Sequence, residues 1–477
     1  MTIMNTMNIN PHIFRAYDIR GIAMGEKPDL TIETMKLIGQ GMGTYMQRTY
    51  QTKNMMVGRD NRLHSPELQN AFIEGVLSTG LDVVDCGIST SPLLYYSVCK
   101  FGMDSGVNIT ASHNPKEYNG VKLVREGAHS VCGEELQKIL KLIQDQDFET
   151  GSGERSEKND NFDVYKEDIV SRIKLAKPLK VVIDAGNGTA GKFAPELFRA
   201  LGCEVTELYC ELDGNYPNHE ANPEEEENMR ELGELVREQG ADLGIGFDGD
   251  GDRVGVVDEH GKHYSADFLV ILLARELLAN KPGSQIVFDV KVSKTLIQEI
   301  EKNGGVPVMC KTGHSFIETK MHEIHAPLAG EISGHLFFGK DHYDYYGFDD
   351  AFFGACKILQ ILAASAKPFS QHFTDLPKLY TTPEYKTPCP DDKKFAVVEE
   401  LTKAFEREHN CITIDGVRVN FDDNSWGAVR CSNTSPNLTL RFEAQTEERL
   451  NEIQKIMVEK LLQYPEVDVW WAKDLKN

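Results

Sequence analysis

Residues 181–188 read VVIDAGNG, and residues 190–202 continue as AGKFAPELFRALG. The β-branched run predicts a buried strand, the Gly/Asn turn ends it, and the apolar spacing that follows predicts a helix. The same arrangement recurs where MMVGRDNR (55–62) precedes SPELQNAFIEGVLSTG (65–80), and where IVFDVKVS (286–293) precedes KTLIQEIEKNG (294–304). Repeated strand–turn–helix units favour an α/β fold whose ligand-binding loops lie at the strand ends.

The 477 residues divide into four regions. The polar segment QDQDFETGSGERSEKNDNFD (144–163) indicates a linker, VDEHGKHY (257–264) indicates a strand end and turn, and AASAKPFSQHFTD precedes a Pro-rich connection. Strands followed by a helix make the last region closer to α+β. We therefore expect four domains, and their predicted bounds are 1–157, 158–262, 263–375 and 376–477.

Charge and composition exclude several classes of protein. The chain has 51 Lys+Arg against 74 Asp+Glu, a net charge of −23, so nucleic acid and anionic membranes are poor partners, whereas a small anion can still bind a locally positive pocket. The apolar run FLVILLA (268–274) is far shorter than the ~20 residues of a membrane span. Ten scattered cysteines without a CxxC pair, and an N-terminus unlike a secretory signal, predict a reduced, cytoplasmic, soluble protein.

The segment FDGDGDRVGVVD (247–258) predicts a metal site. Asp248, Asp250 and Asp252 alternate with glycines that allow a tight loop, and three carboxylates this close repel one another unless a cation lies among them. Oxygen ligands of this kind suit Mg²⁺. An EF-hand is excluded because Arg253 stands where the calcium loop requires Gly.

A second motif, NITASHNPKEYNGVKL (108–123), places Ser112 in a turn. A serine in such a loop is usually a cap or turn residue, and no GxSxG elbow surrounds it, so acyl transfer is a poor interpretation. With a metal loop elsewhere in the chain, a serine that carries a phosphoryl group becomes plausible, because the cation neutralises charge on the group in transit.

Three further motifs carry weaker indications. RCSNTSP (430–436) offers guanidinium, hydroxyl and amide donors to a phosphate, and Arg441 follows it. GEISGH (330–335) presents Glu331 and Ser333 on one side of an extended segment, where they can bind sugar hydroxyls. FRAYDIRG (14–21) and KTGHS (311–315) add basic residues, and no nucleotide-binding motif is present.

These segments occur in a fixed order, FRAYDIRG, GRDNR, TASHNP, DGDGDR, KTGHS, GEISGH and RCSNTSP…LRFEA, from residue 14 to about residue 444. Their combination resembles the α-D-phosphohexomutase superfamily, specifically its bacterial phosphomannomutase/phosphoglucomutase branch. The resemblance implies an α/β fold of four domains around a central cleft, three with a related mixed α/β core and a C-terminal α+β domain like the TATA-binding protein.

The resemblance also implies a role for each matching residue. Ser112 is the expected phosphoserine, and a metal ion would be held by Asp248, Asp250, Asp252 and an oxygen of Ser112. Charged groups expected around the reacting phosphate are Arg20, Lys122 and Arg253, and His335 lies beside the sugar loop. Expected substrate contacts are Tyr17, Lys291, His314, Glu331, Ser333, Arg430, Ser432, Asn433 and Thr434.

The implied reaction moves phosphate reversibly between the 1- and 6-positions of a hexose phosphate through phosphoserine and a 1,6-bisphosphate. Lys122, Arg20 and His335 are the candidates for moving the hydroxyl proton, and histidine has the most suitable ordinary pKa. One Mg²⁺ per chain, a hexose 1,6-bisphosphate activator, hexose phosphate substrates and a monomer or weak homodimer complete the expectation.

Other functions stay open at this stage. Phosphoglucosamine mutases carry Gln and Gly where Ile332 and Asn433 stand here, so mannose and glucose phosphates are favoured over glucosamine phosphate. A metal-dependent sugar phosphatase with Asp248 as nucleophile explains the metal loop but lacks DxDxT and leaves Ser112 without a role. A non-catalytic sugar-phosphate sensor is the third alternative.

Overall fold

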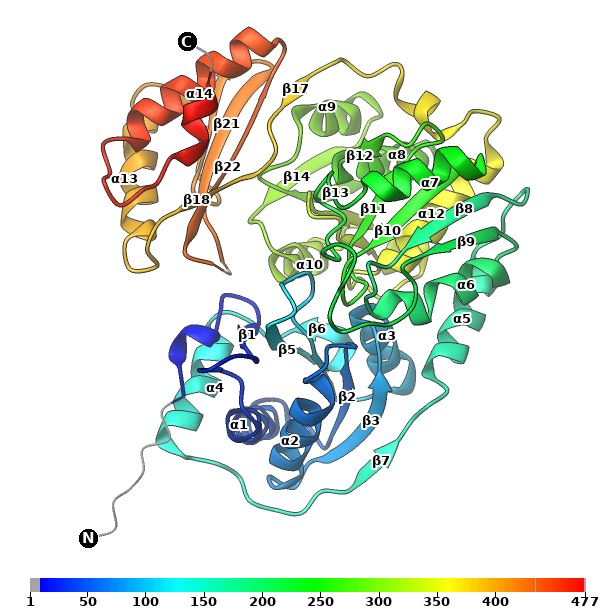
Figure 1. The fold of residues 1–477 in the computed structure, drawn as a ribbon, viewed down its shortest axis with the longest axis vertical. Helices are drawn as coiled ribbons and strands as arrows, with labels where there is room; N and C mark the ends of the chain where they lie inside the picture. Colours follow the sequence, from blue (N-terminus) through cyan, green and yellow to red (C-terminus); the bar gives the residue numbers. More distant parts are fainter. Residues whose placement is uncertain (1–8, 434, 476–477) are drawn as a thin grey trace.

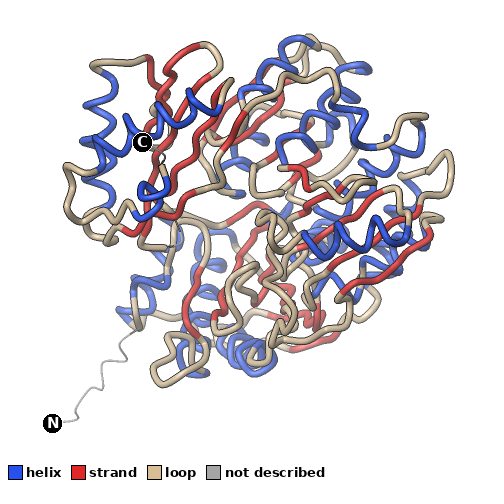
Figure 2. Tube along the Cα trace, turned by 45° about the horizontal axis from the view of Figure 1, so that its top comes forward, coloured by secondary structure: helices blue, strands red, loops and turns tan. Residues whose placement is uncertain are grey.

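Four β-sheets follow one another along the chain in the computed structural model, which describes residues 9–433 and 435–475 (Figure 1). The first three sheets combine parallel and antiparallel strands, and the fourth is antiparallel throughout its described pairs. The prediction of three mixed α/β units and a C-terminal α+β unit is therefore confirmed. Many connecting loops meet in the middle of the molecule, where they lie between the sheets (Figure 2).

The first sheet has the strand order β1-β5-β4-β2-β3-β7, with β6 paired to β5. Its strands are β1 (Ile19–Ile22), β2 (Asn54–Arg59), β3 (Asp82–Ile88), β4 (Ser105–Ile109), β5 (Tyr118–Arg125), β6 (His129–Ser130) and β7 (Arg155–Glu157). Its helices are α1 (Ile32–Tyr50), α2 (Ser65–Leu77), α3 (Ser91–Phe101) and α4 (Glu134–Asp145). The side chains of Thr31 and Thr90 cap α1 and α3 by accepting backbone N–H groups of the first turn.

The segment 144–163 is more than the linker that its composition predicts. Residues 155–157 form β7, which pairs in parallel with β3 at the sheet edge. Gly153 makes this possible, because a Cβ there would lie 1.8 Å from the carbonyl oxygen of Leu81. The three residues are exposed and polar, so no hydrophobic alternation marked them as a strand.

The second sheet has the order β12-β11-β10-β8-β9 and the third has the order β14-β13-β15-β16. The second unit comprises α5 (Asn161–Arg172), β8 (Lys180–Asp184), α6 (Ala194–Ala200), β9 (Glu204–Leu208), α7 (Arg230–Gln239), β10 (Leu243–Phe247), β11 (Val254–Val257) and β12 (His263–Tyr264). The third comprises α8 (Ala266–Asn280), β13 (Gln285–Asp289), α9 (Lys294–Lys302), β14 (Val306–Cys310), α10 (His314–Glu323), β15 (Leu328–Gly330), β16 (Leu336–Phe338), α11 (Lys340–Tyr343) and α12 (Ala351–Ala364).

The fourth sheet has the order β17-β22-β21-β20-β19, with β18 also on β22. Its elements are β17 (Tyr380–Thr381), β18 (Tyr385–Pro388), α13 (Lys394–Glu406), β19 (Asn410–Ile412), β20 (Val417–Asp422), β21 (Ser425–Cys431), β22 (Asn437–Ala444) and α14 (Glu447–Leu461). Helices α13 and α14 cover the face of this sheet that points away from the rest of the molecule (Figure 1). Short 3₁₀ turns complete the fold at Pro11–Ile13, Glu126–Ala128, Thr189–Lys192, Phe369–Phe373 and Trp470–Asp474.

Apolar burial is divided unequally among these units. One continuous core joins α3 of the first unit with the second and third units, and it includes Tyr96, Phe247 and Phe352. The other face of the first sheet packs on α1, α2 and α4 as a second core. The fourth unit has its own core, which includes Phe405 and Phe442.

The apolar run 268–274 lies in α8, whose residues are mostly buried in the large core. Among residues 9–433 and 435–475, no helix has both the length and the apolar character needed to cross a bilayer.

Candidate active site

Ser112 lies in the loop between β4 and β5, at the edge where the first and second units meet. Its backbone is left-handed (φ 51°), and its side chain is almost completely buried. The Ser112 hydroxyl donates a hydrogen bond to Asp248 Oδ2 at 2.7 Å, although the two residues are 136 positions apart. The predicted serine and the predicted metal loop are therefore in direct contact.

The three aspartates of the metal loop follow β10 and converge. Asp248, Asp250 and Asp252 are fully buried, and one carboxylate oxygen of each lies within 4.8 Å of the other two. Lys122 from β5 forms ion pairs with Asp250 (2.7 Å) and Asp252. Among the described residues, Oδ1 of Asp250 has no hydrogen-bond partner, and the nearest polar group to Oδ1 of Asp252 is His335 Nε2 at 3.3 Å; both buried oxygens face the triad and can serve as ligands for a cation.

Neighbouring charges shift the pKa values of these groups in opposite directions. Burial, together with Asp252 and Asp250, raises the pKa of Asp248 well above its ordinary value. Burial alone would raise the pKa of Asp252, but Lys122 and His335 bring it well below that value. Burial opposes the charge of Lys122, yet Asp250 and Asp252 raise its pKa well above normal. Lys122 is therefore fixed as a cation between two carboxylates.

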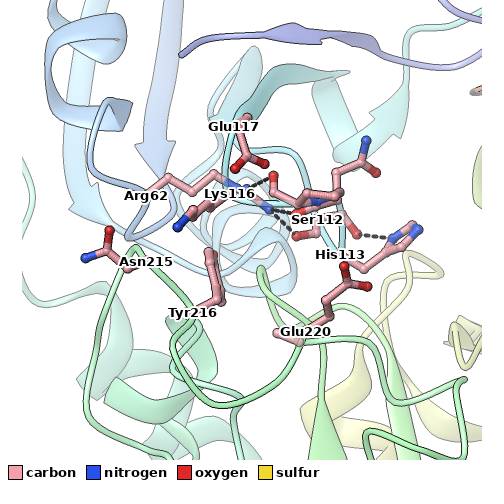
Figure 3. Close-up of a pocket in the computed structure, with 11 residues that line it drawn as sticks. Arg62, Ser112, His113, Lys116, Glu117, Asn215, Tyr216 and Glu220 are labelled. Carbon is pink, nitrogen blue, oxygen red and sulfur yellow. Dashed lines mark hydrogen bonds between the residues drawn. The ribbon is translucent and has the colours of Figure 1, made fainter. Parts of the chain in front are cut away.

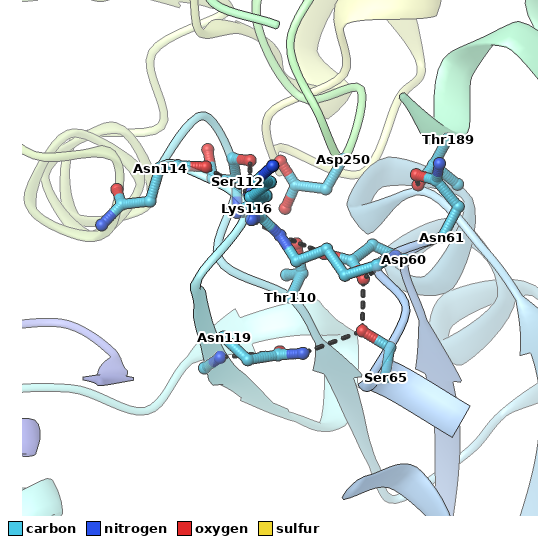
Figure 4. Close-up of polar contacts among 12 residues, drawn as sticks. Asp60, Asn61, Ser65, Thr110, Ser112, Asn114, Lys116, Asn119, Thr189 and Asp250 are labelled. Carbon is cyan, nitrogen blue, oxygen red and sulfur yellow. Dashed lines mark hydrogen bonds and ion pairs between the residues drawn. The ribbon is translucent and has the colours of Figure 1, made fainter. Parts of the chain in front are cut away.

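Arg62 holds the shape of the Ser112 loop. Its guanidinium donates to the carbonyl oxygens of Ser112 (2.8 Å), Asn114 (2.6 Å) and Pro115 (2.7 Å), as Figure 3 shows. Asp60 accepts from Arg62 Nε at 3.0 Å, so the arginine is itself fixed. Asp60 also accepts from Ser65 Oγ, a contact that Figure 4 shows. All three nitrogens of the buried guanidinium therefore donate charge-assisted hydrogen bonds.

Arg62 is the last residue of the GRDNR segment, and residue type alone predicted no role for it. Its partners in the loop are backbone carbonyls, which leave no trace in residue type. Residue spacing therefore does not indicate this contact.

The GEISGH segment lies between β15 and β16 and joins the metal loop. A backbone bridge pairs Arg253 with His335, and the Val254 N–H donates to the Gly334 carbonyl at 3.1 Å. Glu331 accepts from the Gly313 N–H at 2.7 Å and from the Ser333 hydroxyl at 2.7 Å. The sugar-loop residues are thus set against the acidic triad.

His335 is the most strongly coupled histidine of the site. Its Nδ1 lies 2.8 Å from Glu331 Oε2, and its Nε2 lies 3.3 Å from Asp252 Oδ1 and 3.7 Å from Asp349 Oδ2. Burial would lower the pKa of His335, but Asp252 and Glu331 raise it to about 10. The imidazole is therefore protonated at neutral pH in this arrangement, which its ordinary pKa did not indicate.

A central cavity of about 700 Å³ collects predicted residues from all four units. It is lined by Tyr17, Arg20, Arg253, Lys291, His314, Glu331, Ser333, His335, Arg430, Ser432 and Asn433, together with other residues. A neighbouring cavity of about 320 Å³ is lined by Ser112 and Arg62, and His113, Asn114 and Pro115 line both cavities. The Ser112 loop therefore separates the two cavities.

Arg430 on β21 lies at the fourth-unit side of the central cavity. Its Nε donates to Asp415 Oδ2 at 2.7 Å, while its Nη2 is buried and has no hydrogen-bond partner among residues 9–433 and 435–475. Asn433 donates to the Thr312 carbonyl at 3.3 Å, which ties the phosphate loop to the third unit. Thr434, also predicted here, lies outside the described residues.

Two basic residues have partners that the sequence did not suggest. Lys291 forms an ion pair with Glu384 of the fourth unit. Arg441, which follows the RCSNTSP segment in the sequence, donates to the Lys291 carbonyl (2.5 Å) and to Asp267 (3.2 Å). Through these two hydrogen bonds, Arg441 connects β22 to the third unit.

Four models of known protein families match successive parts of this chain. Residues 11–150, 163–261 and 265–380 match the phosphoglucomutase/phosphomannomutase alpha/beta/alpha domains I, II and III, and residues 384–460 match the C-terminal domain. The chain belongs to the phosphoglucomutase/phosphomannomutase family.

Relatives match nearly the whole chain. A phosphomannomutase/phosphoglucomutase of Pseudomonas aeruginosa is 44% identical over 450 residues, which cover 94% of this chain and 95% of that protein. A phosphoglucomutase of Neisseria gonorrhoeae is 40% identical, with coverage of 94% and 96%. The crystal structure of a family protein from Burkholderia thailandensis superposes with a TM-score of 0.87 at 38% identity and covers 98% of this chain and 99% of that one.

Proposed function

We propose that this protein moves phosphate between the 1- and 6-positions of mannose and glucose phosphates, with Ser112 as the phosphate carrier. The observation that carries the proposal is the contact between the Ser112 hydroxyl and Asp248 beside a cavity lined with cations at both ends. The names of the relatives support the same reaction class.

The acidic triad fits Mg²⁺, and we propose one ion per chain on Asp248, Asp250, Asp252 and an oxygen of phosphorylated Ser112. Buried carboxylate oxygens that lie within 4.8 Å of one another are the kind of ligand that this hard cation prefers. When bound, Mg²⁺ supplies positive charge that stabilises a phosphoryl group in transit.

The remaining cavity residues divide between the two ends of the substrate. At the reacting end, Arg20 and Arg253 face the cavity beside the Ser112 loop, and Arg20 Nη1 donates to Asn114 Oδ1 at 2.8 Å. At the far end, the unpaired Nη2 of Arg430 is available to the non-reacting phosphate, with Ser432, Asn433 and Thr434 as further donors. Glu331 and Ser333, between these ends, bind sugar hydroxyls, and Tyr17, Lys291 and His314 complete the substrate contacts.

In the forward step, a sugar hydroxyl oxygen forms a bond to phosphorus as the bond from phosphorus to Ser112 Oγ breaks. The products are a 1,6-bisphosphate and the free serine, and the reverse transfer from the other phosphate regenerates phosphoserine. A hexose 1,6-bisphosphate is therefore also the activator that phosphorylates an empty serine.

The hydroxyl proton goes to His335 in this proposal. Arg20 faces the cavity but a guanidinium does not give up its proton in proteins. Lys122 is engaged by two carboxylates. His335 lines the cavity, and a cation held by Asp252 would offset the carboxylate charge that contributes most to raising the pKa of His335, so the imidazole would come closer to the range of a proton acceptor.

Ile332 and Asn433 favour mannose and glucose over glucosamine phosphate, as the sequence comparison of the sugar and phosphate loops indicates. The first alternative activity is that of a phosphoglucosamine mutase, and the second is that of a metal-dependent sugar phosphatase. We further propose a monomer or weak homodimer acting in the cytoplasm; the ten cysteines, all within the described ranges, are free thiols.

The first test is a mutase assay with Mg²⁺, a trace of hexose 1,6-bisphosphate, and mannose, glucose or glucosamine 1-phosphate. We expect 6-phosphates from the first two sugars and little from the third. Ser112→Ala abolishes turnover, whereas Ser171→Ala, a surface serine bonded to its own helix, does not. Dominant glucosamine turnover contradicts the sugar assignment, and release of inorganic phosphate supports the phosphatase.

A further inference from the structure

A second group of side chains of the kind that ligate metals shares no residue with the acidic triad. It consists of His129 on β6 and of Glu318 and His322, one turn apart on α10. The two histidines line a cavity of about 1080 Å³ that shares no described lining residue with the central one. Helix α10 lies directly beside β6 (Figure 1). None of these three residues has a part in the proposed reaction.

The donor atoms are spaced for a small cation. His129 Nδ1 lies 3.5 Å and His322 Nε2 lies 3.8 Å from the same oxygen, Oε1 of Glu318, and one donor of each residue lies within 4.8 Å of the others. In a tetrahedral zinc site with bonds near 2.0–2.1 Å, neighbouring donors are about 3.4 Å apart. The group therefore needs displacements of less than about 1 Å to bind a metal with three protein ligands.

Hydrogen bonding does not account for this cluster. Distances of 3.5 and 3.8 Å exceed those of N–H···O hydrogen bonds. His322 Nε2 is buried and has no partner among the described residues. A buried, unpaired imidazole nitrogen beside a carboxylate is costly unless another group satisfies it.

Glu318 is oriented independently of the histidines. Ser130 donates its backbone N–H to both carboxylate oxygens at 3.3 Å and its hydroxyl to Oε2 at 2.5 Å. Such outer partners fix the direction of a ligating carboxylate in metal sites. The side chain of Glu318 is only 6% exposed, whereas those of His129 and His322 are about one-third exposed to the cavity.

We infer that His129, Glu318 and His322 form a binding site for a divalent transition metal such as Zn²⁺. Two imidazoles and one carboxylate form a ligand set of zinc and its neighbours, whereas Mg²⁺ prefers oxygen ligands. Because His129 belongs to the first family domain and the other two residues to the third, a bound ion would cross-link the two domains. The site goes beyond the proposed mutase activity and does not depend on it.

Equilibrium dialysis against Zn²⁺ in excess Mg²⁺, followed by metal analysis, tests the inference on the full chain. Since the acidic triad can itself take zinc, the difference between variants decides. We expect the wild type to bind one more Zn²⁺ than His129→Ala or His322→Ala, each of which weakens this site at least about tenfold. His325→Ala, which lines the same cavity outside the cluster, is the matched control and binds as the wild type does.

A second readout is thermal unfolding. Zn²⁺ is expected to raise the unfolding midpoint of the wild type and of His325→Ala in a concentration-dependent way, and to raise it less in the two ligand variants. Equal zinc stoichiometry and affinity in the wild type and both ligand variants would overturn the inference. Zinc that remains in both variants but is lost after thiol alkylation is cysteine-bound and overturns it as well.

Discussion

Gly249→Ala tests the close approach of the metal loop to the Ser112 loop. An alanine Cβ at this position would lie 2.4 Å from the Ser112 carbonyl oxygen, and the next atoms are 3.4 Å away. Real Cβ contacts are essentially never shorter than 3.0 Å, so the two loops must separate by at least about 0.6 Å. The Gly249 backbone does not require a positive φ, so the effect is purely steric.

This displacement acts on the reacting atom. The oxygen that must move is also the acceptor for Arg62, and its residue carries the hydroxyl that lies 2.7 Å from Asp248. A separation of about 0.6 Å along that bond exceeds the usual O–H···O range. A misplacement of about 1 Å can lower a rate about 10²-fold, so we expect kcat to fall by about 10- to 100-fold with little change in KM.

Steady-state mutase kinetics and the phosphoserine content from intact mass are the measurements. Gly246→Ala is the matched control, because a Cβ there meets the flexible side chain of Met229 instead of backbone. Overpacking is expected to cost each variant about 1–3 kcal/mol of stability, which a denaturant titration measures. A folded Gly249→Ala enzyme with wild-type kcat would refute the argument that this contact positions Ser112.

Three further predictions concern charge and metal. Arg62→Met leaves the buried carboxylate of Asp60 without its partner and should lower the free energy of unfolding by about 3–5 kcal/mol in a urea titration. The surface control Arg48→Met should lower it by less than about 1 kcal/mol. Equal losses in the two variants would contradict the conclusion that the Arg62–Asp60 pair stabilises the fold. Asp415→Ala removes the hydrogen bond that orients Arg430 and should raise KM about tenfold with kcat nearly unchanged. The exposed control Asp423→Ala should leave both constants unchanged. A fall in kcat without a change in KM would show that Asp415 does not act through phosphate binding by Arg430. Chelation of Mg²⁺ should abolish turnover and lower the thermal midpoint, and added Mg²⁺ should restore both in a dose-dependent way; a midpoint insensitive to Mg²⁺ means that the acidic triad is stable without a cation.

Local patterns in the sequence were enough to predict the elements that depend on short-range spacing. The triad of aspartates lies within five residues, so the loop between β10 and β11 can be predicted as a cluster of carboxylates. Strand–turn–helix units gave the α/β class for the same reason. The contact between Ser112 and Asp248 spans 136 residues, and only the resemblance to a known family predicted it.

Counter-charges at the site were missed because they come from distant parts of the chain. Glu384, which pairs with Lys291, and Asp415, which pairs with Arg430, stand in segments without a recognisable motif. Arg441 received no role from the sequence, and its partner Asp267 lies 174 positions away in the chain. Pairings of this kind are decided by how whole units dock, which residue spacing does not describe.

The separate core of the fourth unit has a consequence for how the protein melts. Residues such as Phe405 and Phe442 pack only with their own unit among the described cores, whereas the first three units are joined through α3 and the large core. Two cooperative units of unequal size are therefore expected, and a calorimetric scan should resolve a smaller transition beside the main one. A hexose phosphate held by residues on both sides of the boundary would couple the units and merge the two transitions into one.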